Sequence, residues 1–406
     1  MSLSQENITF PSLAPEAGKQ RAAASAWYLD FVAWTVALAV IGYPLAGLIS
    51  SYLAVSDSSI SIAFHLFVVF LSAAVFVVNG VRFGLRPLDT SFVIFYLWYL
   101  GRLIWDTGRA DQPDADLALL IMVGTTIIPL IGVLVPRVEW DERNLAKCMF
   151  AVGAAISVLS IVLYRLGLSV DDAESLGRLE FEKLNPITLG HTAATTILTA
   201  VIGWQYWKSH FWRLASLVPV ACAASILFLA ASRGPLIAFG ICFSFYSIAK
   251  KQWILLAIMV GSLLVVVNSA PIFDGETLFE RIRISGIQPE DSASLRITFM
   301  TTAWEEFLDN PLFGSGYSLP VVGGYPHNVI VEAAMALGIG GLVLLLSLFG
   351  RAMFKAWPAI RGEHALSAIL FVQYFVATEV SGSLWGDAPV VIFMVRLLSP
   401  VERAPR

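Results

Sequence analysis

The chain is a succession of long apolar runs separated by short polar connections. A helix crosses the hydrocarbon core of a bilayer with about 20 predominantly apolar residues, whereas a strand of a membrane barrel uses about 10 in alternation. The runs have the lengths of helices. The sequence therefore predicts an all-α, polytopic membrane helical bundle of about 12 transmembrane helices, over residues 27–49, 59–79, 90–105, 117–135, 145–164, 187–207, 211–231, 234–249, 252–269, 328–349, 365–383 and 388–399.

The positions of Lys and Arg orient the predicted bundle, because the cytoplasmic connections of membrane proteins are enriched in these residues. With the N-terminus inside, 16 of the 26 basic residues fall on the cytoplasmic side and eight on the outer side. Both termini are therefore predicted to be cytoplasmic, as tails of residues 1–26 and 400–406. The first apolar run is longer than a signal-peptide core and is expected to remain as a span.

Two predicted outer connections are unusually long. The first, residues 165–186, is charged, and the second, residues 270–327, contains a helical stretch of its own, Ala293–Leu308. Asn310-Pro311 is expected to end that helix, since the residue before a proline disfavours the α region. Long loops of this kind are usually functional. The predicted order is helices 1–9 over residues 27–269, the long outer loop over 270–327, and helices 10–12 over 328–399.

Composition excludes several classes of protein. Apolar residues make up 57% of the 406 residues and charged residues 14%, and the mean hydropathy is +0.74, so a soluble domain is excluded because such domains carry about 25% charged residues. The net charge of −4 argues against a nucleic-acid partner. The three cysteines have no metal-ligand spacing, and no phosphate loop or nucleotide fingerprint is found. Neither a metal nor another cofactor is expected.

One histidine stands at a distinctive place. His327 and Asn328 lie where the long outer loop re-enters the membrane, and an imidazole there is either an interfacial, capping residue or a general base near neutral pH. Glu332 lies about one and a half helical turns further on and is a weaker candidate for orienting it. His65 and His191 lie within predicted spans and are expected to be packed, hydrogen-bonded residues.

Three arginines on the predicted outer side are candidates for anion binding. Arg233 lies between two apolar runs with almost no loop, where it either marks a helix end by snorkelling or serves a site. Arg296, on the predicted loop helix, and Arg178 are next to ordered-looking sequence, although each alone could be an ordinary surface charge. Because arginine binds phosphate oxygens in a bidentate manner, converging guanidinium groups would hold a diphosphate without a metal.

His327 and Asn328 are followed by nine residues, then Gly338, two residues and Gly341. With this spacing, the region 175–345 resembles the bacterial O-antigen ligase and O-antigen polymerase superfamily. That superfamily shares a pattern of His, then Asn, Ser or Gln, nine further residues, Gly, two residues, and Gly, Thr or Tyr. The residues that match are His327, Asn328, Gly338 and Gly341, and the neighbouring segments that resemble recurrent family segments are Asn185–Gly190, Ser232–Leu236, Arg296, Trp304, Asn310-Pro311 and Gly314–Gly316.

The resemblance implies a membrane glycosyltransferase of the GT-C kind in the bacterial inner membrane. Its donor would be a glycan on undecaprenyl diphosphate, and its acceptor either another lipid-linked glycan, in polymerases, or lipid A-core, in ligases. It implies that His327 acts on the acceptor hydroxyl, that Arg233 and Arg296 take part in catalysis by binding the diphosphate, and that Arg178, Asn328 and Glu332 contact the substrate. Membrane lipid would surround the chain, and a chain-length regulator is a further candidate partner.

Two features favour a polymerase over a ligase. The ligases often have Leu four residues after a basic residue, whereas Met300 and Ile237 stand at those positions after Arg296 and Arg233. The long outer loop is also acidic, with eight carboxylates against three arginines. A transporter of lipid-linked glycans is the alternative from another class, but transporters have midplane charges and symmetric halves, which are not evident here. A non-catalytic assembly subunit would tolerate loss of His327.

Overall fold

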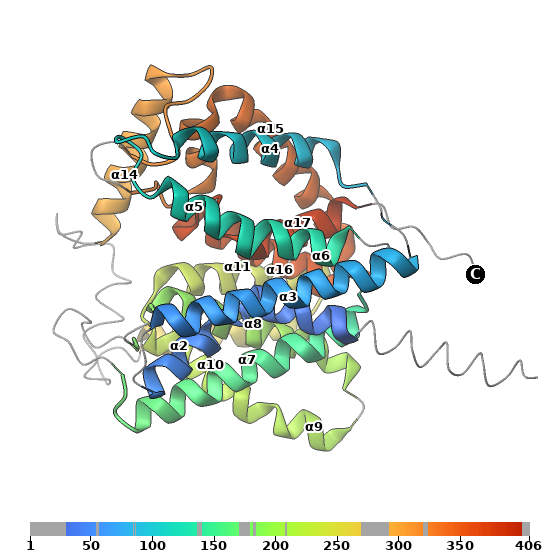
Figure 1. Ribbon diagram of the computed structural model, residues 1–406. Helices are drawn as coiled ribbons and strands as arrows, with labels where there is room; N and C mark the ends of the chain where they lie inside the picture. Colours follow the sequence, from blue (N-terminus) through green and yellow to red (C-terminus); the bar gives the residue numbers. More distant parts are fainter. Residues whose placement is uncertain are drawn as a thin grey trace, which may run out of the picture.

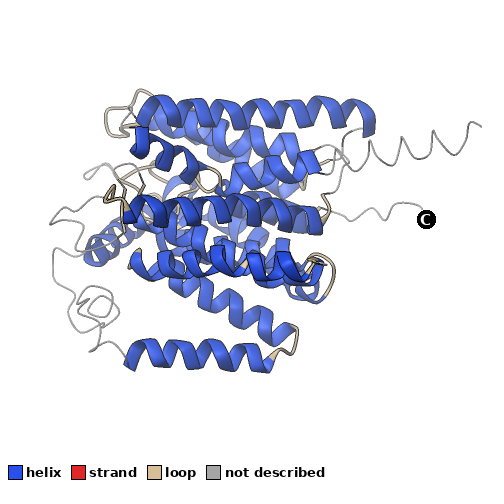
Figure 2. Ribbon diagram, turned by 90° about the horizontal axis from the view of Figure 1, so that it is seen from below, coloured by secondary structure: helices blue, strands red, loops and turns tan. Residues whose placement is uncertain are grey.

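The computed structural model describes residues 30–53, 57–83, 85, 87–135, 140–169, 179–181, 184–207, 209–268, 292–319 and 324–399. Within these residues the ordered elements are helices and no strand is present, apart from isolated bridges such as the one between Phe181 and Leu184 (Figure 2). The predicted all-helical class is thereby confirmed. The predicted tails, Arg178 and most of the first half of the long loop lie outside the described residues.

Within the described residues, each of the twelve predicted apolar runs overlaps one or more helices. The run nearest the N-terminus is divided into Asp30–Ile41 and a second helix, which are bent by 64° at Gly42. The other labelled elements are α2 (Tyr43–Leu53), α3 (Asp57–Phe83), α4 (Thr90–Asp106), α5 (Ala115–Ile121), η1 (Met122–Ile127), α6 (Ile128–Leu134), α7 (Glu142–Arg165), α8 (Pro186–Gly203), η2 (Trp204–Tyr206), α9 (His210–Ala215), α10 (Leu217–Leu229), α11 (Arg233–Ala249), α12 (Trp253–Asn268), α14 (Ser292–Asp309), α15 (Val329–Arg361), α16 (Ala365–Ser381) and α17 (Ala388–Leu398).

Several of these helices are long and apolar enough to cross a bilayer. Among the described residues there are six, or seven if the bent N-terminal pair is one span. α11, α16 and α17 are apolar but shorter, so the number twelve stays a prediction. Large apolar side chains on the outside of the bundle are highly exposed, including Val81 at 86% and Phe354 at 83%. Such surfaces are typical of lipid contact, and together these features support a helical membrane protein.

The helices run side by side in one bundle, with α16 inside it (Figure 1). α16 packs against α8, α11, α15 and α17, and most of its residues are buried. The helix predicted over Ala293–Leu308 is present as α14, and it ends at Asp309, directly before Asn310-Pro311 as expected. α14 packs on α15 through a small apolar cluster that lies apart from the main core, made of Ala303, Leu319 and Met335 with Phe299 and Val331.

A glycine breaks α15 shortly after its start. Gly338 has φ 68° and ψ −162°, which a residue with a Cβ rarely adopts, and a Cβ there would lie 2.5 Å from the carbonyl oxygen of Leu312. The break lets the N–H of Ile339 donate to the carbonyl of Pro311 at 2.8 Å. The structure thus shows that Gly338 fastens α15 to the turn after α14.

Candidate functional site

His327 directly precedes the N-cap residue of α15 and has a strained backbone conformation. Its φ of 57° belongs to the left-handed region, which costs free energy for a residue other than glycine and is found disproportionately at functional sites. Its ring stacks on Phe299 of α14, with centroids 6.1 Å apart, and lies 4.3 Å from the ring of Tyr325. Tyr325 in turn meets Trp385 edge to face at 5.6 Å. Phe299 and Tyr325 therefore contact the imidazole directly, and Trp385 supports Tyr325.

Asn328 joins the start of α15 to the end of α16. It is the N-cap of α15, because its Oδ1 accepts a hydrogen bond from the N–H of Val331 at 2.9 Å. Its Nδ2 donates to the backbone carbonyl of Glu379 at 2.9 Å. The last carbonyls of a helix have no partner within the helix, so this donor satisfies one of them. We refer to residues Glu379–Ser381 as the α16 terminus.

Arg296 approaches the same helix end from α14. Its Nη1 donates to the carbonyl of Val380 at 3.3 Å, and a guanidinium is favourably placed beside the negative end of a helix dipole. The side chain is half-buried, and burial lowers the pKa of the Arg296 guanidinium, although a neighbouring Tyr325 acts in the opposite direction. The guanidinium nevertheless stays protonated at neutral pH.

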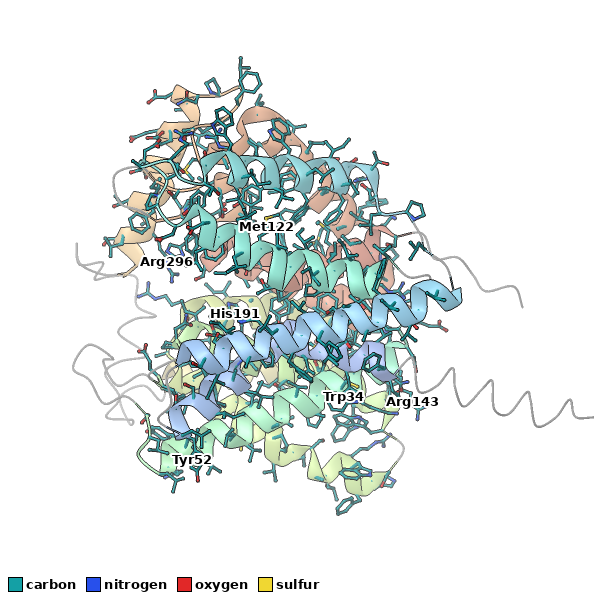
Figure 3. The ribbon with its side chains drawn as sticks, viewed as in Figure 1. Trp34, Tyr52, Met122, Arg143, His191 and Arg296 are labelled. Carbon is teal, nitrogen blue, oxygen red and sulfur yellow. The ribbon has the colours of Figure 1, made fainter. Side chains whose placement is uncertain are left out.

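Arg233 is the first residue of α11, and the helix begins against the α16 terminus. A methyl group on the next residue, Gly234, would lie 3.3 Å from Cγ1 of Val380 and 4.0 Å from Nε2 of His191. The start of α11 is therefore in contact with the turn that receives Arg296 and Asn328. Figure 3 shows Arg296 and His191 toward one end of the bundle and Arg143 at the other.

The electrostatics of the site favour a neutral imidazole. Burial and the positive charge of Arg296 both lower the pKa of His327 below its ordinary value, while the backbone of Ser381 acts in the opposite direction. Asp387 accepts a hydrogen bond from the N–H of Ser383 at 2.6 Å, and burial raises the pKa of its carboxyl to about 7. Burial also raises the pKa of Tyr325 to about 12. Because the pKa of His327 is lowered, its imidazole is neutral at neutral pH and is available as a proton acceptor.

Glu332 has no solvent-exposed surface and its carboxylate is already engaged. Oε1 accepts from the Tyr99 hydroxyl at 2.6 Å and Oε2 from the N–H of Leu384 at 2.9 Å. It therefore joins α4, α15 and the loop between α16 and α17. The predicted contact of Glu332 with a substrate stays a prediction, and this geometry favours a positioning role toward that loop instead.

Arg178 lies outside the described residues, but the next residue, Leu179, is hydrogen-bonded close to the site. The N–H of Leu179 donates to the carbonyl of Leu229 at 2.8 Å, at the end of α10 and just before Arg233.

His191 differs from expectation: it is packed, but neither ring nitrogen has a hydrogen-bond partner among the described residues. His65 is hydrogen-bonded as expected, with Nδ1 2.8 Å from the carbonyl of Ser61.

Sequence reasoning did not identify the residues that surround His327. Phe299, Tyr325 and Trp385 come from three segments, and nothing in a single sequence shows that they meet. A partial signal existed for Tyr325, which lies two residues before His327 in Gly-Tyr-Pro-His. Val380 and Ser381 contribute backbone groups and leave no signal in residue type.

The comparison with known families covers this site. A family model described as O-antigen ligase matches residues 218–346, a range that contains Arg233, Arg296, His327 and Asn328. The resemblance to the O-antigen ligase and polymerase superfamily is thereby confirmed. No curated protein matches the chain. Among the described residues, no group of three His, Cys, Asp or Glu side chains could hold a metal ion.

Proposed function

We propose that this chain, which carries the O-antigen ligase domain, is a membrane glycosyltransferase of the GT-C kind. It transfers a glycan from undecaprenyl diphosphate to an acceptor hydroxyl on the periplasmic side of the bacterial inner membrane. With twelve spans and both termini in the cytoplasm, the α16 terminus faces that side. The observation that carries the proposal is the meeting of α11, α14 and α15 at the α16 terminus. Arg296 and Asn328, the residue after His327, both donate hydrogen bonds to it.

His327 is proposed to accept the proton of the acceptor hydroxyl. The hydroxyl oxygen then attacks the anomeric carbon of the donor sugar, a new glycosidic C–O bond forms, and the bond from that carbon to the diphosphate oxygen breaks. Undecaprenyl diphosphate leaves with the electron pair. A base is suited to this step when it is neutral at working pH, which the lowered pKa of His327 provides. A positioned base contributes about 10²- to 10⁴-fold.

Arg296 and Arg233, with Arg178, are proposed to bind the diphosphate. Arg296 uses one N–H on the carbonyl of Val380, and a guanidinium has further N–H groups in a planar fork that suits phosphate oxygens. Because its side chain is half-buried, its charge is screened less than that of a surface arginine. Fixed positive groups then stabilise the negative charge of the departing diphosphate, and stabilisation of this kind usually contributes more to catalysis than any other single effect.

The acceptor is proposed to be another lipid-linked glycan, as in a polymerase. Support comes from the acidic long loop and from Met300 and Ile237 at positions where ligases often have Leu. The test uses the full chain in nanodiscs with a donor of undecaprenyl diphosphate carrying one repeat unit, with and without lipid A-core. Elongation of the lipid-linked glycan supports a polymerase, and product formed solely with lipid A-core identifies a ligase. Translocation of the donor without a new covalent bond would contradict both.

A further inference from the structure

A cavity lies at the opposite end of the bundle from the α16 terminus. It has a volume of about 590 Å³ and lies between α7 on one side and η2, α9 and α10 on the other. On α7 its lining residues follow helical spacing, from Arg143 and Lys147 near the start of the helix to Ala151 and Ala154 deeper along it. Figure 3 shows Arg143 at this end, on the predicted cytoplasmic side.

Two cations line the cavity, and no ion-pair partner for either is found among the described residues. Nε of Arg143 is buried and has no hydrogen-bond partner among the described residues. Lys147 is exposed, and its Nζ is 3.5 Å from Oδ1 of Asn144. The neighbouring acids do not neutralise these two cations: Asp141 accepts from the backbone N–H of Arg143, and Glu142 accepts from the Ser367 hydroxyl at 2.5 Å. A buried donor without a partner favours an anionic ligand.

The rest of the lining is apolar and aromatic. Trp207 and Trp212 lie at the opposite wall, and Trp212 is 64% exposed. Arg213 is not available to a ligand at this rim, because its Nε donates to the carbonyl of Trp207 at 2.8 Å and its guanidinium lies over the ring of Trp204. The cavity therefore has positive charge near the start of α7, at Arg143 and Lys147, and apolar walls elsewhere. This distribution matches an amphiphile with an anionic head group.

We propose that this cavity binds an anionic phospholipid of the cytoplasmic leaflet. Arg143 and Lys147 hold its phosphate, and its acyl chains lie along Ala151, Ala154 and Trp212. The volume is within the range of about 300–1,000 Å³ that is usual for small-molecule sites. The cavity is at the far end from the proposed transfer site, so the two proposals can succeed or fail separately.

The test is native mass spectrometry of the detergent-purified full chain during titration with phosphatidylglycerol or phosphatidylcholine. We expect selective retention of phosphatidylglycerol. We expect the double variant Arg143→Gln/Lys147→Gln to bind it at least about tenfold more weakly, since both groups that hold the phosphate lose their charge. The variant Arg143→Lys/Lys147→Arg keeps both charges and should retain binding. Lys251→Gln, which removes an exposed charge outside the cavity, is the matched control.

A second variant tests the cavity itself. Ala151→Trp fills the apolar part from an exposed position and leaves both cations in place, so it should weaken phosphatidylglycerol binding without changing surface charge. Equal binding by wild type, Ala151→Trp and the double Gln variant would overturn the proposal. Preferential retention of undecaprenyl phosphate over phosphatidylglycerol would also overturn it, because the site would then belong to the prenyl carrier.

Discussion

The amide nitrogen of Asn328 donates a hydrogen bond to the backbone carbonyl of Glu379, 2.9 Å away. Through this bond the first turn of α15 is fixed to the last turn of α16, although the two residues are 51 positions apart in the chain. His327 directly precedes Asn328, so the bond also sets where the imidazole stands. The geometry of the proposed site therefore depends on a contact between one side chain and one helix end.

Removing this contact should affect both stability and transfer. Asn328→Ala loses the N-cap of α15 and the donor to Glu379, and loss of a cap costs about 0.5–2 kcal/mol. Asn328→Asp keeps the cap acceptor but cannot donate to a carbonyl, so it should retain most of the stability and still transfer glycan more slowly. Thermal unfolding and transfer rates of both variants separate the two effects. Equal activity of Asn328→Asp and wild type would contradict a positioning role.

Arg296 should control the pH dependence of transfer. Its positive charge lowers the pKa of His327, and transfer needs the neutral imidazole, so activity falls as the pH drops through that pKa. Arg296→Gln removes the charge and should move the acid limb of the pH–rate profile to higher pH, in addition to weakening donor binding. Arg165→Gln, at an exposed position at the end of α7, is the control. An unmoved acid limb would show that the two side chains do not interact.

Glu332 should behave as a positioning residue. Glu332→Ala leaves the Tyr99 hydroxyl and the N–H of Leu384 buried without an acceptor, at a cost of about 1–3 kcal/mol each in the free energy of unfolding. Glu332→Gln keeps one acceptor and should cost less. If the role is positioning, Glu332→Gln lowers kcat and leaves the KM for the donor unchanged. A raised KM with normal kcat would instead indicate contact with the substrate.

The carboxyl of Asp387 should make stability depend on pH. Its pKa is raised in the folded chain to about 7, so the folded state holds this proton more tightly than the unfolded state, whose pKa is about 3.9. The favourable contribution is present below about pH 4 and is lost as the pH rises toward about 7. Asp387→Asn keeps an acceptor for Ser383 and should flatten this slope. The melting temperatures of both proteins across this window give the difference directly.

The sequence was sufficient to predict the helices, because each apolar run has the length and composition of one. It also predicted α14 and its end, since helical spacing and Asn310-Pro311 are local signals. The break at Gly338 and the aromatic residues around His327 could not be predicted. They depend on backbone conformation and on contacts between distant segments, such as Phe299 with His327. Hydrogen bonds to backbone carbonyls, as at Val380, are equally invisible in residue type.

The central claim is that His327 performs the chemical step while the arginines bind the donor. The most direct measurement is single-turnover transfer from purified undecaprenyl-diphosphate-linked glycan at saturating donor, together with donor affinity, for His327→Ala and for the exposed control His210→Ala. We predict that His327→Ala binds donor like wild type and transfers about 10²- to 10⁴-fold more slowly, with His210→Ala unchanged. Transfer by His327→Ala at the wild-type rate would contradict the claim.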